Sequence, residues 1–389
     1  MSASSSFDPT GAFGERVRHH FVLDPDVVFL NHASFGATPR SVLAARRALE
    51  DELEAQPVAF FERLPPRIRA MVAQVAPVLG APADCLLPVD NATTGVTAVL
   101  RSLPLGPGDA ILTTNLAYAA VSKGIRFVAE RRGCDIVEAE VPYPLDGPEQ
   151  VVDAVMDAVT ERVRIAVIDH ITSVTGLVFP VEELIERLHA RGVPVLVDGA
   201  HVPGHLDVDL EALGADYWVG NLHKWLFAVK GCAVLYAHPR THDTLAPLVI
   251  SHGWGESLPA AFDYQGTRDP TGWLSVPAAL SFAEEVGGLP AIREHNRRLA
   301  HHGARIVADA VGLSPGAPLS MCPALVSLVV PGPTGFERST TVVRRLLEEH
   351  RVQTFAMPVP QGIVVRVCAQ IYNTEADYEQ LARGLAAVR

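Results

Sequence analysis

V-P-V-L-V-D-G-A-H, at Val193–His201, is the stretch that decides the fold of this chain. Its apolar and β-branched residues end at Asp198, which predicts a buried parallel strand with a carboxylate at its carboxyl end. Further along, V-G-N-L-H-K-W at Val219–Trp225 places Lys224 in a tight polar turn. The two stretches predict an α/β sheet with an acid at one strand end and a lysine on a following loop.

This acid and this lysine are the two groups that a protein needs in order to use pyridoxal 5'-phosphate (PLP). The lysine amine forms a Schiff base with the cofactor aldehyde, and the acid keeps the pyridine nitrogen protonated so that the ring accepts electrons. We therefore predict that Lys224 and Asp198 are the catalytic residues of a PLP-dependent enzyme.

The composition is typical of a globular enzyme and argues against several other classes. The chain has 389 residues, 48% hydrophobic and 20% charged, which suffices for a large core and two or three domains. A net charge of -12 argues against nucleic acid or an acidic membrane as a partner, because either would favour a basic face. Segment 1–14 has no apolar signal core and no run of about eighteen apolar residues occurs, so we expect a soluble, cytoplasmic protein.

The cysteine and histidine patterns predict no metal site. Five scattered cysteines, none spaced C-x-x-C, suit a reducing compartment and offer neither a zinc site nor a disulfide framework. His201 and His205 lie four residues apart, but Pro203 and Gly204 interrupt the helix that would align them. The sequence also lacks the motifs of nucleotide-binding enzymes and serine hydrolases.

Short apolar runs alternate with amphipathic, helix-length runs between residues 110 and 236. This alternation predicts a mainly parallel sheet covered on both faces, with ligands bound beyond the carboxyl ends of its strands, where Asp169 and Asp198 fall. The predicted strands are Ala110–Thr114, Asp135–Val141, Arg164–Asp169, Val193–Asp198, Tyr217–Val219 and Cys232–Tyr236. The predicted helices are Tyr118–Arg131, Pro148–Thr160 and Pro180–Ala190.

The C-terminal part has a different pattern, which predicts a smaller α+β domain. We expect an N-terminal segment over residues 1–25, a large domain over 26–272 and a small domain over 273–389. The predicted elements of the last part are helices at Trp273–Glu285, Gly288–Val311, Ser339–His350 and Glu375–Val388, and strands at Ala324–Val330 and Gly362–Cys368.

These stretches resemble the class V aminotransferase family of fold-type I PLP enzymes, to which cysteine desulfurases and isopenicillin N epimerase belong. The similarity extends from F-L-N-H-A-S-F-G at Phe29–Gly36 to I-Y-N-T-E at Ile371–Glu375. It implies a mainly parallel seven-stranded sheet in the large domain. It also implies a homodimer with shared active sites, because Gly266–Asp269 resembles a motif in which Thr267 reaches the phosphate of the neighbouring subunit.

The resemblance also implies roles around the cofactor. Ala200 would lie under the ring, His201 near its phenolic oxygen or the phosphate, and Tyr118 would stack on the ring. The loop Asn91–Gly95 precedes a helix, and a helix N-terminus suits a phosphate. The other residues that the resemblance assigns to cofactor binding are Thr93, Thr94, Ser173, Asn221, His223 and Thr267.

Arg366, in V-V-R-V-C-A-Q, matches the family arginine that binds the α-carboxylate of the substrate. A guanidinium pairs with a carboxylate through two hydrogen bonds, and an arginine flanked by valines on a strand is costly unless it has a partner. The resemblance also implies that Asn31 and His32 face the substrate. An arginine in this role predicts an α-amino acid as the substrate.

A cysteine desulfurase needs a nucleophilic cysteine on a mobile loop before the arginine, and Pro358–Gly362 takes that position without one. We expect Cys322 to open a strand instead, and Cys368 to lie in the core. Lys224 is the expected base for the Cα proton. We favour an α,β-eliminating C–S lyase that acts on a cysteine-derived conjugate in natural-product biosynthesis, such as that of an antibiotic. Epimerisation, as in isopenicillin N epimerase, and transamination are the alternatives, whereas the intact Lys224, Asp198 and Arg366 argue against a non-catalytic binding protein.

Overall fold

The computed structural model describes residues 12–389, and a seven-stranded sheet lies at the centre of its larger part. The strand order is β2-β8-β7-β6-β5-β3-β4, in which β8 runs antiparallel to its neighbours and the other strands run parallel to one another. The strands are β2 (Leu86–Val89), β3 (Ala110–Thr114), β4 (Asp135–Ala139), β5 (Val163–Asp169), β6 (Val195–Asp198), β7 (Tyr217–Asn221) and β8 (Ala233–Ala237). The predicted α/β fold with a mainly parallel sheet is confirmed.

Helices cover both faces of this sheet, because successive side chains along a strand point to opposite faces and the central strands are apolar on both. One face packs against α6 (Ala92–Ser102) and α7 (Ala119–Arg132), and the other against α8 (Glu149–Ala158) and α9 (Val181–His189). The side chains on the α6–α7 face include Ile111, Ile165, Val167 and Leu196. Those on the other face include Leu112, Ala166, Ile168 and Val197.

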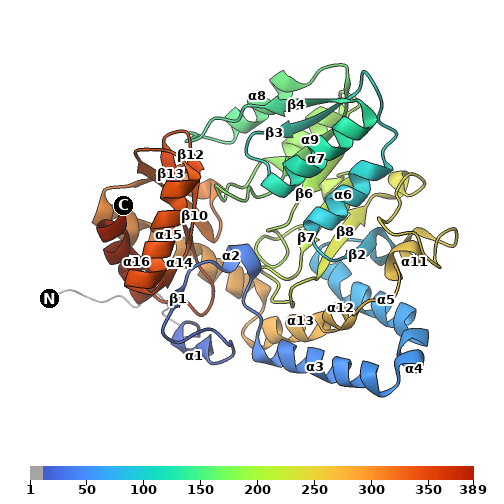
Figure 1. Cartoon of the computed structure of the whole chain (residues 1–389), viewed down its shortest axis with the longest axis horizontal. Helices are drawn as coiled ribbons and strands as arrows, with labels where there is room; N and C mark the ends of the chain where they lie inside the picture. The colour runs from blue at the N-terminus through green and yellow to red at the C-terminus, as the bar shows by residue number, and fades with distance from the viewer. Residues whose placement is uncertain (1–11) are drawn as a thin grey trace.

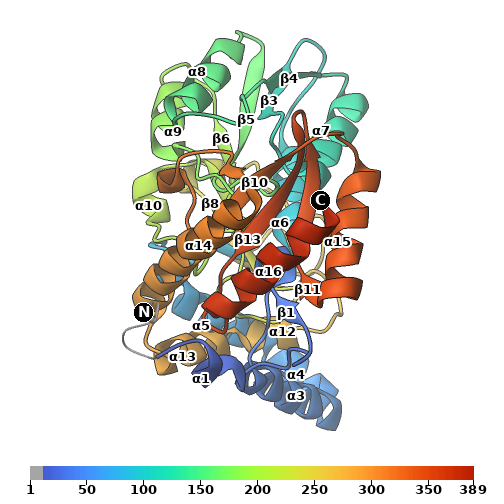
Figure 2. The same cartoon turned by 90° about the vertical axis from the view of Figure 1, so that its left-hand side faces the viewer.

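A second, antiparallel sheet belongs to the C-terminal part, with the order β12-β13-β10-β9. Helices α14 and α15 pack on this sheet, and α16 packs on both of these helices. Figure 1 shows these elements gathered on the opposite side of the molecule from the seven-stranded sheet, and Figure 2 shows α14 and α16 side by side in front of β10 and β13. The elements are β9 (Ser314–Pro315), β10 (Leu325–Pro331), β12 (Phe355–Val359), β13 (Gly362–Cys368), α14 (Leu289–Val311), α15 (Phe336–His350) and α16 (Glu375–Val388).

The N-terminal segment connects the two parts. Strand β1 (Val28–Phe29) pairs in parallel with β11 (Val352–Gln353), and α2 (His32–Phe35) follows it between the two sheets (Figure 1). The other elements are α1 (Glu15–Arg18), α3 (Arg40–Ala55), α4 (Pro57–Glu62), α5 (Leu64–Val75), α10 (Leu210–Leu213), α11 (Leu258–Asp263), α12 (Thr271–Leu274) and α13 (Val276–Glu285). Short 3-10 turns lie at Ala76–Val78, Ala83–Cys85, Pro239–Thr241 and Leu319–Met321. Across residues 12–389, no helix combines the length and the apolar character needed to cross a bilayer.

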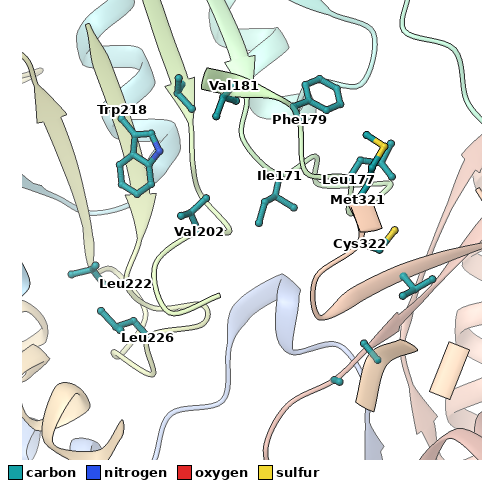
Figure 3. Close-up of a cluster of buried hydrophobic side chains, with 14 of the residues drawn as sticks. Ile171, Leu177, Phe179, Val181, Val202, Trp218, Leu222, Leu226, Met321 and Cys322 are labelled. Atoms are coloured by element: carbon teal, nitrogen blue, oxygen red, sulfur yellow. The ribbon is translucent and has the colours of Figure 1, made fainter. Parts of the chain in front are cut away.

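Buried side chains join the loops at the carboxyl ends of the strands to the C-terminal part. Ile171 follows β5, Val202 follows β6, and both are buried. Figure 3 shows Ile171 between Val202 on one side and Met321 and Cys322, which precede β10, on the other; all four belong to the same buried cluster. Burial of such a cluster stabilises the two parts against each other and so fixes the strand ends beside the second sheet.

The structure corrects the predicted helix Trp273–Glu285. It is divided at Ser275 into α12 and α13, with Pro277 in the first turn of α13. Proline is tolerated in the first turn of a helix because the N–H groups there have no partner within the helix, so the missing hydrogen of proline costs nothing. The division of the chain into domains at residues 25/26 and 272/273 stays a prediction.

One prediction near the C-terminus is also corrected. Cys322 does not open a strand, because it follows the 3-10 turn Leu319–Met321 and β10 begins only at Leu325. Pro358–Gly362, which takes the position of the desulfurase loop, contains the end of β12 and the tight turn into β13. Strand β12 lies at the edge of its sheet, where a proline such as Pro358 is tolerated.

Candidate active site

A cavity of about 480 Å³ opens at the carboxyl ends of β5, β6 and β7, a size typical of small-molecule sites. Parallel strands end at one edge of a sheet, so segments that are distant along the chain meet there. The predicted cofactor-binding residues in its wall are Thr93, Thr94, Tyr118, Ser173, Asp198, Ala200, His201, Asn221, His223 and Lys224. The wall also contains Ser34, Phe35, Asn91, Ala92, Asp169 and Ile171. Asn91 and Ala92 belong to the predicted phosphate loop and Asp169 ends a predicted strand, whereas no site role was predicted for the other three.

Lys224 lies in the turn after β7, and its Nζ lies 3.0 Å from His201 Nε2. Burial lowers the pKa of Lys224 to about 8, and the charge of Arg366 acts in the same direction, whereas Asp198 opposes it. A lysine with this pKa is partly a neutral amine near neutral pH. The neutral amine is the form that acts as a nucleophile or a base.

Asp198 and Asp169 are register neighbours at the ends of β6 and β5, and both are buried. Asp198 accepts a hydrogen bond of 3.0 Å from the N–H of Ala200, and Asp169 accepts one from the backbone N–H of Tyr118. Burial raises the pKa of both carboxyls, and the charge of Asp198 raises that of Asp169 further. Two such neighbours ionise together only at high cost, so the pair readily retains a proton.

The N-terminus of α6 forms another wall of the cavity. Asn91 caps this helix by accepting the N–H of Thr94 at 2.9 Å, and Asn221 Oδ1 accepts the N–H of Ala92 at 2.9 Å. A helix N-terminus carries a partial positive charge and free N–H groups, and the hydroxyl of Thr93 adds a donor. This wall therefore suits a phosphate group.

Arg366 lies on β13 and is 2% exposed. Its Nη1 donates to the carbonyl of Ser173 at 2.7 Å, and its Nη2 donates to Asn31 Oδ1 at 3.0 Å and to Ser34 Oγ at 2.9 Å. The guanidinium carbon lies 3.7 Å from the centre of the Phe355 ring. Among residues 12–389 no carboxylate pairs with this cation, and burial lowers its pKa to about 10. A buried cation without an anion favours the binding of a carboxylate next to it.

His32 is absent from the cavity wall, although the sequence suggested that it faces the substrate. Its Nδ1 accepts from the hydroxyl of Tyr372 at 2.9 Å, and its Nε2 donates to the backbone carbonyl of Lys224 at 2.9 Å. Four residues later, Gly36 has a φ of +67°, and a Cβ there would lie 2.3 Å from the carbonyl oxygen of His223. A glycine is required for such an approach, so this segment is closely fitted to the lysine turn.

Thr267 lies outside the first cavity. It lines a second, larger cavity of about 1320 Å³ beside α4, α5 and α11, where its hydroxyl lies 3.3 Å from that of Tyr264. Val58, in the same wall, is 74% exposed. The structure of one chain thus separates Thr267 from the other predicted cofactor-binding residues.

The cavity wall contains no cysteine. All five cysteines, each within the described part of the chain, are buried and free, and Cys368 lies in the core as predicted. Burial raises the pKa of each thiol, for Cys368 to about 11. Nor do residues 12–389 contain a group of three or more histidine, cysteine, aspartate or glutamate side chains placed to hold a metal ion.

A comparison with family models decides the family, since the model of class V aminotransferases matches residues 28–326. The chain belongs to the class V aminotransferase family. Members of this family are PLP-dependent enzymes, so the family, the enzyme class and the cofactor predicted from the sequence are confirmed.

Curated relatives of this class V chain include an epimerase and a desulfhydrase. One is the isopenicillin N epimerase of Streptomyces clavuligerus, which is 32% identical over 96% of this chain and 98% of the relative. Another is a probable chloroplastic L-cysteine desulfhydrase of Arabidopsis thaliana, which is 31% identical over 93% of this chain and 82% of the relative. Among solved structures, the cystine C–S lyase C-DES in complex with cysteine persulfide has a TM-score of 0.81 at 22% identity, covering 94% of this chain and 98% of its own, and shares the fold.

The residues of this class V cavity fit PLP. The α6 N-terminus suits the phosphate, Lys224 would supply the amine for the aldehyde, and Asp198 would supply the acid for the pyridine nitrogen. Arg366 does not line the cavity itself, but its guanidinium donates to Ser34 and Ser173 of the wall.

Proposed function

We propose that this enzyme is a C–S lyase, which removes the Cα proton of a cysteine-derived amino acid and expels the sulfur substituent from Cβ. Water then hydrolyses the released 2-aminoacrylate, so the products are a thiol, ammonia and a 2-oxo acid. The observation that carries the proposal is the buried amine of Lys224, in contact with His201, in a cavity without a thiol. A desulfurase, by contrast, needs a cysteine thiol at this site.

Bound PLP withdraws electrons from the substrate and so makes its Cα proton acidic. The residues of this chain orient the substrate and transfer the protons. Arg366 binds the α-carboxylate and so orients Cα, while Asp198 holds a proton at the pyridine nitrogen. Lys224 Nζ takes the Cα proton and then donates a proton to the departing sulfur. Elimination therefore needs a single acid–base group, whereas epimerisation needs a second acid on the opposite side of Cα.

The test is a product assay with L-cysteine and a panel of S-substituted L-cysteines in D₂O. We expect equal amounts of thiol and 2-oxo acid, and no product from the D-enantiomers, which serve as the control. Recovery of the D-amino acid with deuterium at Cα, and no 2-oxo acid, would show an epimerase instead. The conjugate that is cleaved with the highest kcat/KM then tests the proposed place in a natural-product pathway.

Epimerisation is the second candidate, because Tyr118 brings a hydroxyl to the cavity and is 44% exposed. A tyrosine at the ring face is a possible proton donor on the side away from Lys224. The same assay separates the two functions. If Tyr118 donates that proton, Tyr118→Phe loses formation of the D-amino acid, whereas elimination by Lys224 is retained.

We also propose that the enzyme is a homodimer that uses the surface around Thr267, and that it works in the reducing cytoplasm. Exposed apolar side chains beside a large cavity support the first part, and five free cysteines support the second. The chain should sediment with twice the mass of one subunit. Val58→Asp should shift it towards the monomer, and Val22→Asp, at another exposed valine, should not. A wild-type protein that sediments as a monomer at micromolar concentration contradicts the dimer.

A further inference from the structure

The side chain of Trp225, directly after the catalytic lysine, lies between two buried histidines. Its ring stacks on His205, with centroids 3.8 Å apart and planes 22° apart. Its Nε1–H donates to His201 Nδ1 at 3.4 Å. All three side chains are at most 4% exposed, so water does not supply alternative partners for these ring nitrogens.

This contact determines which nitrogen of His201 carries the proton. An indole N–H is a donor and never an acceptor, so Nδ1 of His201 must accept. A neutral imidazole that accepts at Nδ1 carries its proton on Nε2. His201 is neutral, because burial and the nearby charge of Lys224 hold its pKa well below the usual value.

The proton on Nε2 then faces Lys224 Nζ, 3.0 Å away. An ammonium group has three donors and no lone pair, so it cannot accept this hydrogen bond. The contact is satisfied only when Lys224 is the neutral amine. The donor and acceptor pattern thus agrees with the direction in which burial moves the pKa of Lys224, although it is an independent observation.

The neighbouring histidine keeps Trp225 in this place. His205 Nε2 accepts the backbone N–H of Ala324 at 2.9 Å, so the His205 proton lies on Nδ1 and is donated to the carbonyl of His201 at 3.1 Å. Because both of its nitrogens make hydrogen bonds, the His205 ring is held in one orientation, and the indole stacks on it. The stacked ring therefore points its N–H at His201.

We propose that Trp225 is a positioning residue whose indole N–H fixes His201 in the tautomer that donates from Nε2 to the amine of Lys224. Trp225 acts through His201 and keeps the lysine as a free base, ready to attack an aldehyde or accept a proton. The proposal rests on the role of Lys224 given above, but its first test needs neither cofactor nor substrate.

The test is ¹⁵N NMR of the histidine side chains in the cofactor-free protein, with His201→Gln to assign the signal by its loss. We expect wild-type His201 to carry its proton on Nε2. In Trp225→Phe, which keeps an aromatic ring but removes the N–H, we expect both tautomers. Trp218→Phe is the matched control, because Trp218 Nε1–H donates at 3.5 Å to a different buried histidine, His170.

A second measurement follows the pH dependence of the rate at which PLP attaches to Lys224. Without the indole N–H, His201 can accept from the ammonium form, so the pKa of Lys224 should rise by about one unit in Trp225→Phe and stay unchanged in Trp218→Phe. A wild-type His201 with its proton on Nδ1 overturns the proposal even if Trp225→Phe does not fold. An unchanged tautomer and an unchanged Lys224 pKa in a folded Trp225→Phe also overturn it. Neither result depends on which reaction the enzyme catalyses.

Discussion

Lys224→Ala is expected to lower the rate of the reaction by about 10²–10⁴-fold, the usual contribution of a general base. The variant should also lose covalent attachment of PLP, because the amine that lies 3.0 Å from His201 Nε2 is gone. Attachment to the wild-type protein should become faster as the pH rises through about 8, since the neutral amine is the nucleophile and its fraction increases through the lysine pKa. Absorption spectra and single-turnover kinetics measure both effects.

Lys230→Ala is the matched control for this experiment. Lys230 lies six residues after Lys224 in the same loop, but it lines a different, smaller cavity and donates to Thr38 Oγ1 at 3.3 Å. Its removal should leave PLP attachment and turnover near the wild-type level. A Lys224→Ala protein that still binds PLP covalently, with full turnover, would show that another amine has the catalytic role.

Arg366→Lys is expected to lower kcat/KM for an amino-acid substrate by roughly 30–1000-fold, the effect of weakening one partner of a buried charge pair. Lysine keeps the positive charge but loses the planar fork that binds a carboxylate through two hydrogen bonds. Its three donors would all be used by hydrogen bonds to Ser173, Asn31 and Ser34, which leaves none for the carboxylate. Steady-state kinetics with an S-substituted cysteine measures the effect.

A change in substrate supplies the control for Arg366. An S-substituted cysteamine lacks the α-carboxylate, so the wild-type enzyme should process it slowly and Arg366→Lys should process it no more slowly than the wild type. Thermal unfolding of both proteins separates a loss of stability from a loss of substrate binding. If the variant loses kcat/KM equally for both substrates, Arg366 supports the fold and does not bind the carboxylate.

The strands at the centre of the large sheet could be predicted because burial on both faces leaves a plain signal in the sequence. Strand β6 is such a run of apolar residues that ends at Asp198, and the bounds of β3, β13 and α16 agree with the prediction. Strands β2 and β12 were missed, and each contains a proline, Pro88 or Pro358. A proline in a sequence argues against a strand, so these two strands were not predicted. Both lie at a sheet edge, where the missing N–H of a proline costs little stability.

The cavity wall could be predicted where a family motif or a strand end marks the residue, as at Lys224 and Asp198. Ser34 and Phe35 belong to the stretch Phe29–Gly36, but its resemblance suggested roles only for Asn31 and His32. The placement of Ser34 and Phe35 in the wall depends on contacts of the four-residue helix α2 with residues more than 180 positions away. Asp169 was noted at a strand end, but its pairing with Asp198 depends on the register of β5 against β6. Register and long-range contact are properties of the assembled sheet, and no local pattern encodes them.

The contacts of α2 determine how late in folding the active site is completed. Asn31 bonds to Arg366 across 335 residues, and His32 bonds to Tyr372 across 340. During synthesis the N-terminal segment must therefore wait for nearly the whole chain to emerge before it meets its partners. The large sheet, with Lys224 already in its turn, has all its strands by residue 237, well before Arg366 is made. Contacts between such distant residues form slowly, so we expect catalytic competence to arrive as the last event of folding, after most of the core is complete.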